Sequence, residues 1–117
     1  MSLERGIRLF NQGRYWDAHE AWEEAWTLDR TGPDRAFYKG LIQIAAGCLH
    51  YQRGNRRGTV NKWGGGAAYL RPLPESHHGV RVGELVCAVE KNLACLDGPA
   101  WPELILPVIQ VDPVPPA

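Results

Sequence analysis

The chain has 117 residues, and its thirteen basic and thirteen acidic side chains cancel at neutral pH. That length is typical of one domain with its own core, and the balanced charge gives no general attraction for nucleic acid or an anionic membrane. No apolar run approaches the ~20 residues that span a bilayer, and the N-terminal segment lacks the apolar core of a signal peptide.

The three cysteines, Cys48, Cys87 and Cys95, show no CxxC pairing. Neither a disulfide framework nor a zinc site is therefore indicated by their spacing. We expect a cytoplasmic protein that needs no metal and no cofactor.

Apolar periodicity predicts an all-α fold, a bundle of about five helices in antiparallel hairpins. Residues 3–12 and 15–28 carry helical stripes on either side of Gly13, which ends the first helix. Because the connection is short, we expect the second helix to fold back against the first.

The third helix, residues 34–53, is apolar over most of its circumference, which is typical of a helix inside a bundle. Ala36, Gly40 and Gly47 form a flat track along it. Glycine inside a helix costs about 1 kcal/mol relative to alanine, so this track predicts that another helix packs very closely there.

The fourth and fifth helices, residues 56–70 and 80–96, complete the bundle. Asn55 is suited to capping the fourth helix. The three glycines of residues 64–66 should cost this helix on the order of 3 kcal/mol against three alanines. We therefore predict that the fourth helix is kinked or frayed.

The composition changes after residue 97, where prolines alternate with apolar side chains. Proline density forbids a helix there, yet the apolar content is high for a free tail. We therefore divide the chain into a helical domain, residues 1–97, and an extended proline-rich segment, residues 98–117. That segment should pack on the bundle or on a partner subunit.

A pair of sequence blocks resembles a known family. The blocks are FNxGxYWxAHExWE over residues 10–23 and GLIQIAA over residues 40–46, followed by His50, Gly54-Asn55 and Gly58. Together they resemble the DUF309 family, small all-helical proteins of bacteria and archaea whose function is unassigned. The resemblance covers roughly residues 3–97. It implies a helical fold and brings no activity, metal or substrate with it.

The second helix places a histidine where apolar residues are expected. At 100° per residue, His19 lies inside the apolar arc and Glu23 at its edge, one turn away. Gln43 and His50 share a polar strip on the third helix, which packing of the two helices should bring near them. The candidate ligand-binding residues are His19, Glu23, Gln43 and His50, with Trp16 and Asn55.

Three interpretations of this group remain open. Two imidazoles and a carboxylate suit zinc or another borderline divalent ion, a cavity would hold a small ligand, and a sealed network would only fix helix register. The sealed network is favoured because the motif is HExxE, not HExxH. Acid–base catalysis is a weaker possibility. A catalytic carboxylate needs a desolvated site, and only Glu23 is placed for one, since Glu20 and Glu24 fall on a solvated face.

Two other groups carry weaker signals. A basic cluster at the junction of the third and fourth helices suits an anion, although five such charges in a neutral protein more often form a solvated rim. His77 and His78 fall in a loop, where the sequence shows no partner for them. The basic cluster consists of Arg53, Arg56, Arg57, Lys62 and Arg71.

We therefore expect a non-catalytic interaction module with a polar site between the second and third helices. The flat glycine–alanine track, the surplus of tryptophan and the apolar tail all favour a homodimer or another protein partner. One alternative is a metal-dependent or acid–base enzyme, resembling a hydrolase, that uses His19, Glu23 and His50. A second alternative, ranked last, is an anion or nucleic-acid binder that uses Arg53, Arg56 and Arg57.

Overall fold

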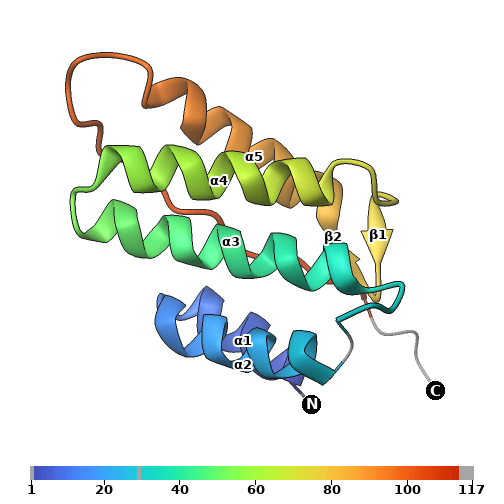
Figure 1. Ribbon diagram of the computed structural model, residues 1–117. Coiled ribbons are helices and arrows are strands. Elements are labelled where there is room, and N and C mark those ends of the chain that lie inside the picture. Colours follow the sequence, from blue (N-terminus) through green and yellow to red (C-terminus); the bar gives the residue numbers. More distant parts are fainter. Residues whose placement is uncertain (1, 29, 114–117) are drawn as a thin grey trace.

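The structure, a computed structural model, describes residues 2–28 and 30–113 (Figure 1). It confirms the predicted all-α fold with five helices, to which it adds a very short β-hairpin. Within the described residues, no helix is both long and apolar enough to cross a membrane. The elements are α1 (Ser2–Asn11), α2 (Tyr15–Leu28), α3 (Arg35–Gln52), α4 (Arg56–Leu70), β1 (Ser76–His77), β2 (Val80–Arg81) and α5 (Val82–Cys95).

The helices pack in layers around α3 and α4, which run antiparallel through the middle of the molecule (Figure 1). The α1–α2 hairpin covers the side of α3 that faces away from α4. On the other side, α5 returns along α4. Gly13 and Gly54 adopt left-handed φ angles of 81° and 70° in the turns before α2 and α4, which lets each hairpin reverse within a few residues.

The glycine track of α3 is filled by α4, as predicted. A Cβ atom on Gly40 would lie 2.6 Å from the Leu70 side chain, and one on Gly47 would overlap the indole ring of Trp63. Trp63 is fully buried, and its Nε1–H donates to the Ile44 carbonyl at 3.2 Å. The glycines therefore serve packing within the chain and leave no free track for a partner.

The prediction of a frayed fourth helix is wrong, because α4 runs unbroken from Arg56 to Leu70. A Cβ atom on Gly66 would lie 2.9 Å from the Gly40 carbonyl oxygen, and one on Gly65 would overlap the amide of Gln43. The low helix propensity of these glycines is thus offset by the close approach of α3. Asn55 caps the helix as predicted, with its side-chain oxygen accepting from the Gly58 amide at 3.0 Å.

Residues 98–113 follow an extended path across the bundle, behind α3 and α4 in Figure 1. The Asn11 side chain holds this segment by accepting from the Ile109 amide at 2.7 Å and donating to the Ile109 carbonyl at 2.9 Å. The Tyr51 hydroxyl makes a second pair of bonds, to Pro102 and Leu104. Residues 114–117 of the predicted segment lie outside the described residues.

The fifth helix begins two residues later than predicted. Val80 and Arg81 form β2, which pairs with β1, and Val80 also bridges to Val111 of the extended segment. These pairings satisfy backbone groups that a longer helix would have used. The hairpin thereby connects the end of α4, the start of α5 and the C-terminal segment.

Candidate functional site

A strip of four side chains follows one edge of α2, at spacings of three, four and three residues, and we call it the α2 strip: Trp16, His19, Glu23 and Trp26. Trp16 is 56 % exposed, and its ring stacks on that of His19 with the centroids 5.3 Å apart and the planes 10° apart. Nε2 of His19 lies 3.8 Å from a Glu23 carboxylate oxygen, which is an ion-pair distance only when the imidazole is protonated. The strip therefore presents an aromatic, an imidazole and a carboxylate in sequence.

Two polar atoms of the α2 strip are buried without a hydrogen-bond partner among the described residues. They are Nδ1 of His19 and Nε1 of Trp26. Buried polar groups in folded proteins are nearly always paired, and an exception calls for a specific explanation such as a bound water molecule or ion. The Trp26 ring is also flanked by two cations, with Arg30 at 5.2 Å and Lys39 at 4.6 Å from its centroid.

The other candidate residues lie on the far side of α3. The side chain of Gln43 extends towards Gly65 of α4, and the His50 ring lies over Gly58 at the start of the same helix. Nδ1 of His50 is 3.1 Å from the side-chain nitrogen of Asn55. His50 and Asn55 thus stabilise the α3–α4 turn.

The structure divides the six candidate residues into two groups. Trp16, His19 and Glu23 meet on α2, whereas His50 and Asn55 meet at the α3–α4 turn and Gln43 lies on the same side of α3, against α4. The ligand atoms of His19, Glu23 and His50 do not gather as a metal site would require, on a search of the described residues. The ligand-binding role of the two groups stays a prediction, and each group has to be considered separately.

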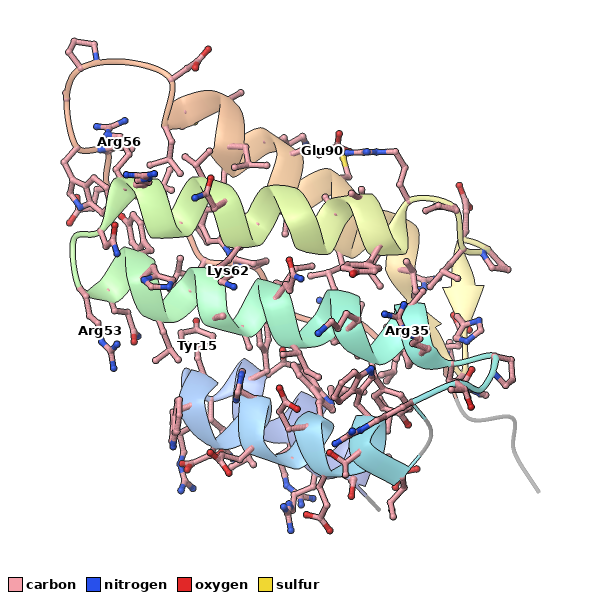
Figure 2. All side chains as sticks on the ribbon, viewed as in Figure 1. Tyr15, Arg35, Arg53, Arg56, Lys62 and Glu90 are labelled. Atoms are coloured by element: carbon pink, nitrogen blue, oxygen red, sulfur yellow. The ribbon has the colours of Figure 1, made fainter. Side chains whose placement is uncertain are left out.

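The predicted basic cluster is partly used inside the fold. The Arg56 guanidinium donates to the Leu96 and Ala100 carbonyls and lies over the Trp101 ring. Arg71 pairs with Glu90 at 3.1 Å. Figure 2 shows Arg53 and Arg56 at the end of the bundle where α3 turns into α4. An anion would therefore compete with bonds that hold the C-terminal segment in place.

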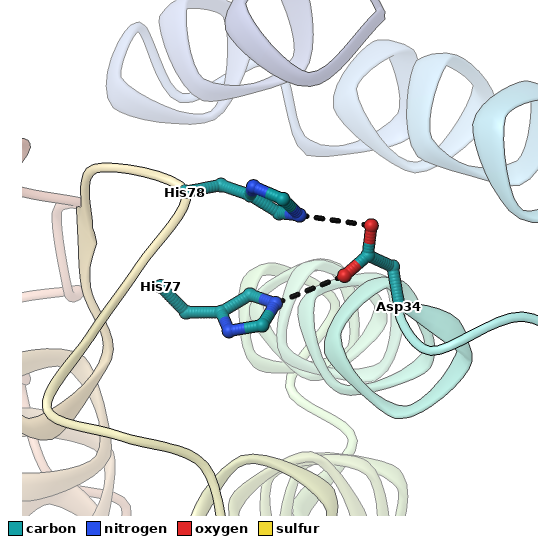
Figure 3. A group of neighbouring side chains, drawn as sticks. All are labelled: Asp34, His77 and His78. Carbon is teal, nitrogen blue, oxygen red and sulfur yellow. Dashed lines mark hydrogen bonds and ion pairs between the residues drawn. The ribbon is translucent and has the colours of Figure 1, made fainter.

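A third group combines residues from distant parts of the chain (Figure 3). Asp34 precedes α3, while His77 ends β1 and His78 begins the hairpin turn. Nε2 of His77 lies 3.0 Å from one oxygen of the Asp34 carboxylate, and Nε2 of His78 lies 2.8 Å from the other. The expectation that these histidines have no partner is wrong.

The carboxylate in this group is held in its charged form. Burial by itself would raise the pKa of Asp34, but the hydrogen bonds from His77 and His78, together with their charges, outweigh burial and lower that pKa below its ordinary value of 3.8. Both imidazole rings also contact the ring of Phe37, which is fully buried. The core thus positions the histidines, and they stabilise the anion.

This group could not be predicted from the sequence, because Asp34 is 43 and 44 residues away from the two histidines. The one local signal is the pair of histidines directly before Gly79, a residue that marks a turn. No periodicity connects that turn with Asp34. The two come together only in the folded chain, where the start of α3 lies against the hairpin.

Comparison with known proteins places the chain in a family. The model of the family described as "Domain of unknown function (DUF309)" matches residues 3–61, about half of the chain. A protein of Aquifex aeolicus (strain VF5), described as an uncharacterized protein, is 27 % identical over 102 residues, which cover 87 % of this chain and 31 % of that protein. The chain therefore spans about a third of this relative's length. It belongs to the DUF309 family, as its blocks around residues 10–23 and 40–46 indicate.

Proposed function

We propose that this chain is a non-catalytic interaction module, that the α2 strip is its binding surface, and that a second copy of the chain is its first partner. The observation that carries the proposal is the exposed Trp16, 56 % accessible, which stacks on His19 beside the Glu23 carboxylate. Large exposed aromatic side chains are enriched in protein interfaces relative to the rest of the surface.

The order of residues along the α2 strip is symmetric. It runs aromatic, imidazole, carboxylate, aromatic, so two strips packed antiparallel about a twofold axis place His19 of each copy opposite Glu23 of the other. In a twofold interface the same surface serves both partners, and each contact occurs twice. Each Glu23 carboxylate would then lie near Nε2 of the opposite His19, and each Trp16 would meet a Trp26.

Two other features fit this assignment. The glycine track of α3, one of the surfaces that favoured a partner, is filled within the chain. This leaves the α2 strip and the exposed apolar side chains of residues 98–113. In the Aquifex aeolicus relative, the matching region is part of a much longer chain. Such an arrangement is typical of an interaction module that is joined to other domains. Three unpaired cysteines are consistent with a reducing, cytoplasmic location.

The test is the mass of the protein in solution over a range of concentrations, measured by analytical ultracentrifugation. We expect a monomer–dimer equilibrium, since one helix pair is at the small end of specific interfaces. Glu23→His should weaken the dimer by placing two imidazoles opposite each other. The double variant His19→Glu/Glu23→His should restore it, because the exchanged strip is again self-complementary.

The matched control is Glu24→His, which makes the same charge change outside the α2 strip. Glu24 pairs only loosely with Arg5, at 3.7 Å between exposed side chains, so this variant should leave the dimer unchanged. A strictly monomeric wild-type chain would contradict the proposal, and so would a double variant no better than Glu23→His.

A further inference from the structure

We infer that Asp34, His77 and His78 form a binding site for a divalent transition-metal ion, with Zn²⁺ as the reference ion. The site is separate from the α2 strip. It combines the start of α3 with the turn of the β-hairpin, and all three side chains point toward one another in Figure 3. Neither the family match nor the relative assigns a metal to these residues.

The donor set suits this class of ion. Imidazole nitrogens and a carboxylate oxygen are common ligands of zinc, and an open zinc site has three protein ligands and a solvent molecule. Two imidazoles favour zinc and its neighbours in the first transition row over Mg²⁺ or Ca²⁺, which prefer oxygen. Among the described residues, this is the one group of three or more such side chains with ligand atoms this close together.

The distances require only a small rearrangement. One ligand atom from each residue lies within 4.8 Å of the others. Bonds of about 2.0–2.2 Å in tetrahedral geometry place donor atoms roughly 3.4 Å apart. In the observed state each Nε2 faces a carboxylate oxygen directly, so an incoming ion would replace two hydrogen bonds. Each imidazole would then carry its proton on Nδ1 and offer Nε2 to the metal.

The backbone of the hairpin turn is what brings both imidazoles to one carboxylate. Neighbouring residues of an extended strand point to opposite faces. His78 has a left-handed φ of 49°, and with Gly79 at 76° it forms the two-residue loop between β1 and β2. Asparagine or aspartate is usual at the first position of such a loop. A histidine there accepts a less favoured conformation, and its ring lies beside that of His77, with centroids 4.5 Å apart.

The surroundings would hold two ligands firmly and leave one side open. Phe37 packs against both rings, at 4.7 Å from His77 and 5.8 Å from His78. A hollow of about 400 Å³ opens beside Asp34 and His78, with room for solvent at a fourth coordination position. The residues that line this hollow are Ser2, Leu3, Glu4, Asp34, Tyr38 and His78.

A metal bound here would connect parts of the chain that are far apart in sequence. Asp34 lies in the connection between α2 and α3, and the histidines lie between α4 and α5. An ion that binds the folded state and not the unfolded state raises stability in proportion to its occupancy. Metal binding should therefore appear as a rise in melting temperature as well as in a binding isotherm.

The experiment uses the full chain without an affinity tag, stripped with a chelator and dialysed into chelator-free buffer. Zn²⁺ is titrated by calorimetry, the visible spectrum of Co²⁺ reports the ligand geometry, and thermal melts are recorded with and without Zn²⁺. We expect one Zn²⁺ per chain and a rise in melting temperature of about 5 °C or more at a hundredfold excess over Kd.

The decisive variant is His78→Asn. Asparagine suits the left-handed turn position, which offsets part of the loss of the hydrogen bond to Asp34. The metal-free variant should therefore still fold, while its Zn²⁺ affinity falls at least about tenfold. Asp34→Asn should lose affinity to a similar extent. His50→Gln is the matched control, because it removes an imidazole outside the site and should bind Zn²⁺ as the wild type does.

Three outcomes would overturn the inference. The first is a wild-type chain that binds no stoichiometric Zn²⁺, which would leave a purely hydrogen-bonded latch between α3 and the hairpin. The second is a His78→Asn variant that binds as tightly as the wild type. The third is equal loss of affinity in His50→Gln, which would place the ion elsewhere.

Discussion

Two tryptophans of this bundle are sealed inside it, and two others lie on the edge of α2. Trp22 and Trp63 have no exposed surface, and each donates its indole N–H to a backbone carbonyl, at 3.3 Å and 3.2 Å. Each also lies over a glycine of a neighbouring helix, Gly6 or Gly47, where a Cβ atom would overlap the ring.

Trp16 and Trp26 have neither feature. Trp16 is more than half exposed, and Nε1 of Trp26 has no hydrogen-bond partner among the described residues. The difference shows how one residue type serves two purposes in the same fold. Where a glycine lets helices approach, the indole is enclosed and its N–H is satisfied. Where no glycine does so, the indole is either exposed, as in Trp16, or partly buried with its N–H unpaired among the described residues, as in Trp26.

The largest expected effect is the difference between truncating a tryptophan of each kind. Trp63→Ala should lower the free energy of unfolding by about 3–5 kcal/mol, because it leaves a cavity between α3 and α4. Trp16→Ala should change it by no more than about 0.5 kcal/mol. Urea unfolding followed by far-UV circular dichroism measures both. Equal losses in the two variants would contradict the division between sealed and available tryptophans.

The glycines beneath the sealed rings should show the next largest effect. Gly47→Ala should destabilise the protein by about 1–3 kcal/mol, since the new methyl group overlaps the Trp63 ring in a packed core. Gly64→Ala is the matched control in α4. A Cβ atom there has no neighbour within 4 Å among the described residues, so the gain in helix propensity of about 1 kcal/mol should appear unopposed. A stabilising Gly47→Ala would mean that the α3–α4 interface is looser than described.

These glycines also mark where sequence-based prediction succeeds and fails. The flat track on α3 correctly indicated a close helix, because an interior glycine has a cost that only packing explains. The same reasoning, applied to Gly64–Gly66 as local propensity alone, wrongly predicted a frayed helix. Its compensating contacts come from Gly40 and Ile44 of another helix, and one helix's propensity contains no information on its neighbour.

Helix bounds were predictable wherever the signal was local. The bounds of α2 and α4 were predicted correctly because their signals are local. Gly13 lies in the turn directly before α2, and Asn55 caps the first turn of α4. The Asp34–His77–His78 group depends on tertiary packing across more than forty residues, so its geometry could not be obtained from spacing. The candidate site on α2 lies between these cases, since Trp16, His19 and Glu23 followed from helical periodicity, whereas Trp26 was not among the predicted site residues.

A smaller effect is expected at the α3–α4 turn. Asn55→Ala should lower the free energy of unfolding by about 1 kcal/mol, because it removes the acceptor for the Gly58 amide and the contact with His50. Asn61→Ala, an exposed position inside α4, is the control and should be neutral or slightly stabilising. Urea unfolding separates the two. An Asn55→Ala variant of unchanged stability would contradict the capping role and would favour the ligand-binding role that the sequence suggested.

The smallest expected effect is a change of stability with pH that arises from Cys48 and appears only at alkaline pH. Cys48 shares the sealed α3–α4 interface with Trp63. Burial raises the pKa of the Cys48 thiol to about 12, although its interaction with Trp63 opposes the rise. An unfolded thiol titrates near 9.0, so the unfolded chain releases its proton first. The stability that protonated Cys48 contributes is therefore complete below pH 9 and is lost as the pH rises from about 9 towards 12.

Comparison with Cys48→Ala isolates this contribution, because the variant lacks the thiol and should lose less stability between pH 9 and 11. Cys87→Ala is the control, since Cys87 is exposed and should leave the alkaline slope unchanged. A thiol reagent at neutral pH gives an independent measure. Cys87 and Cys95 should react at once, and Cys48 only when the bundle unfolds. Rapid reaction of all three thiols would mean that α3 and α4 separate readily, and Trp63 would then lie in an interface as open as that of Trp16.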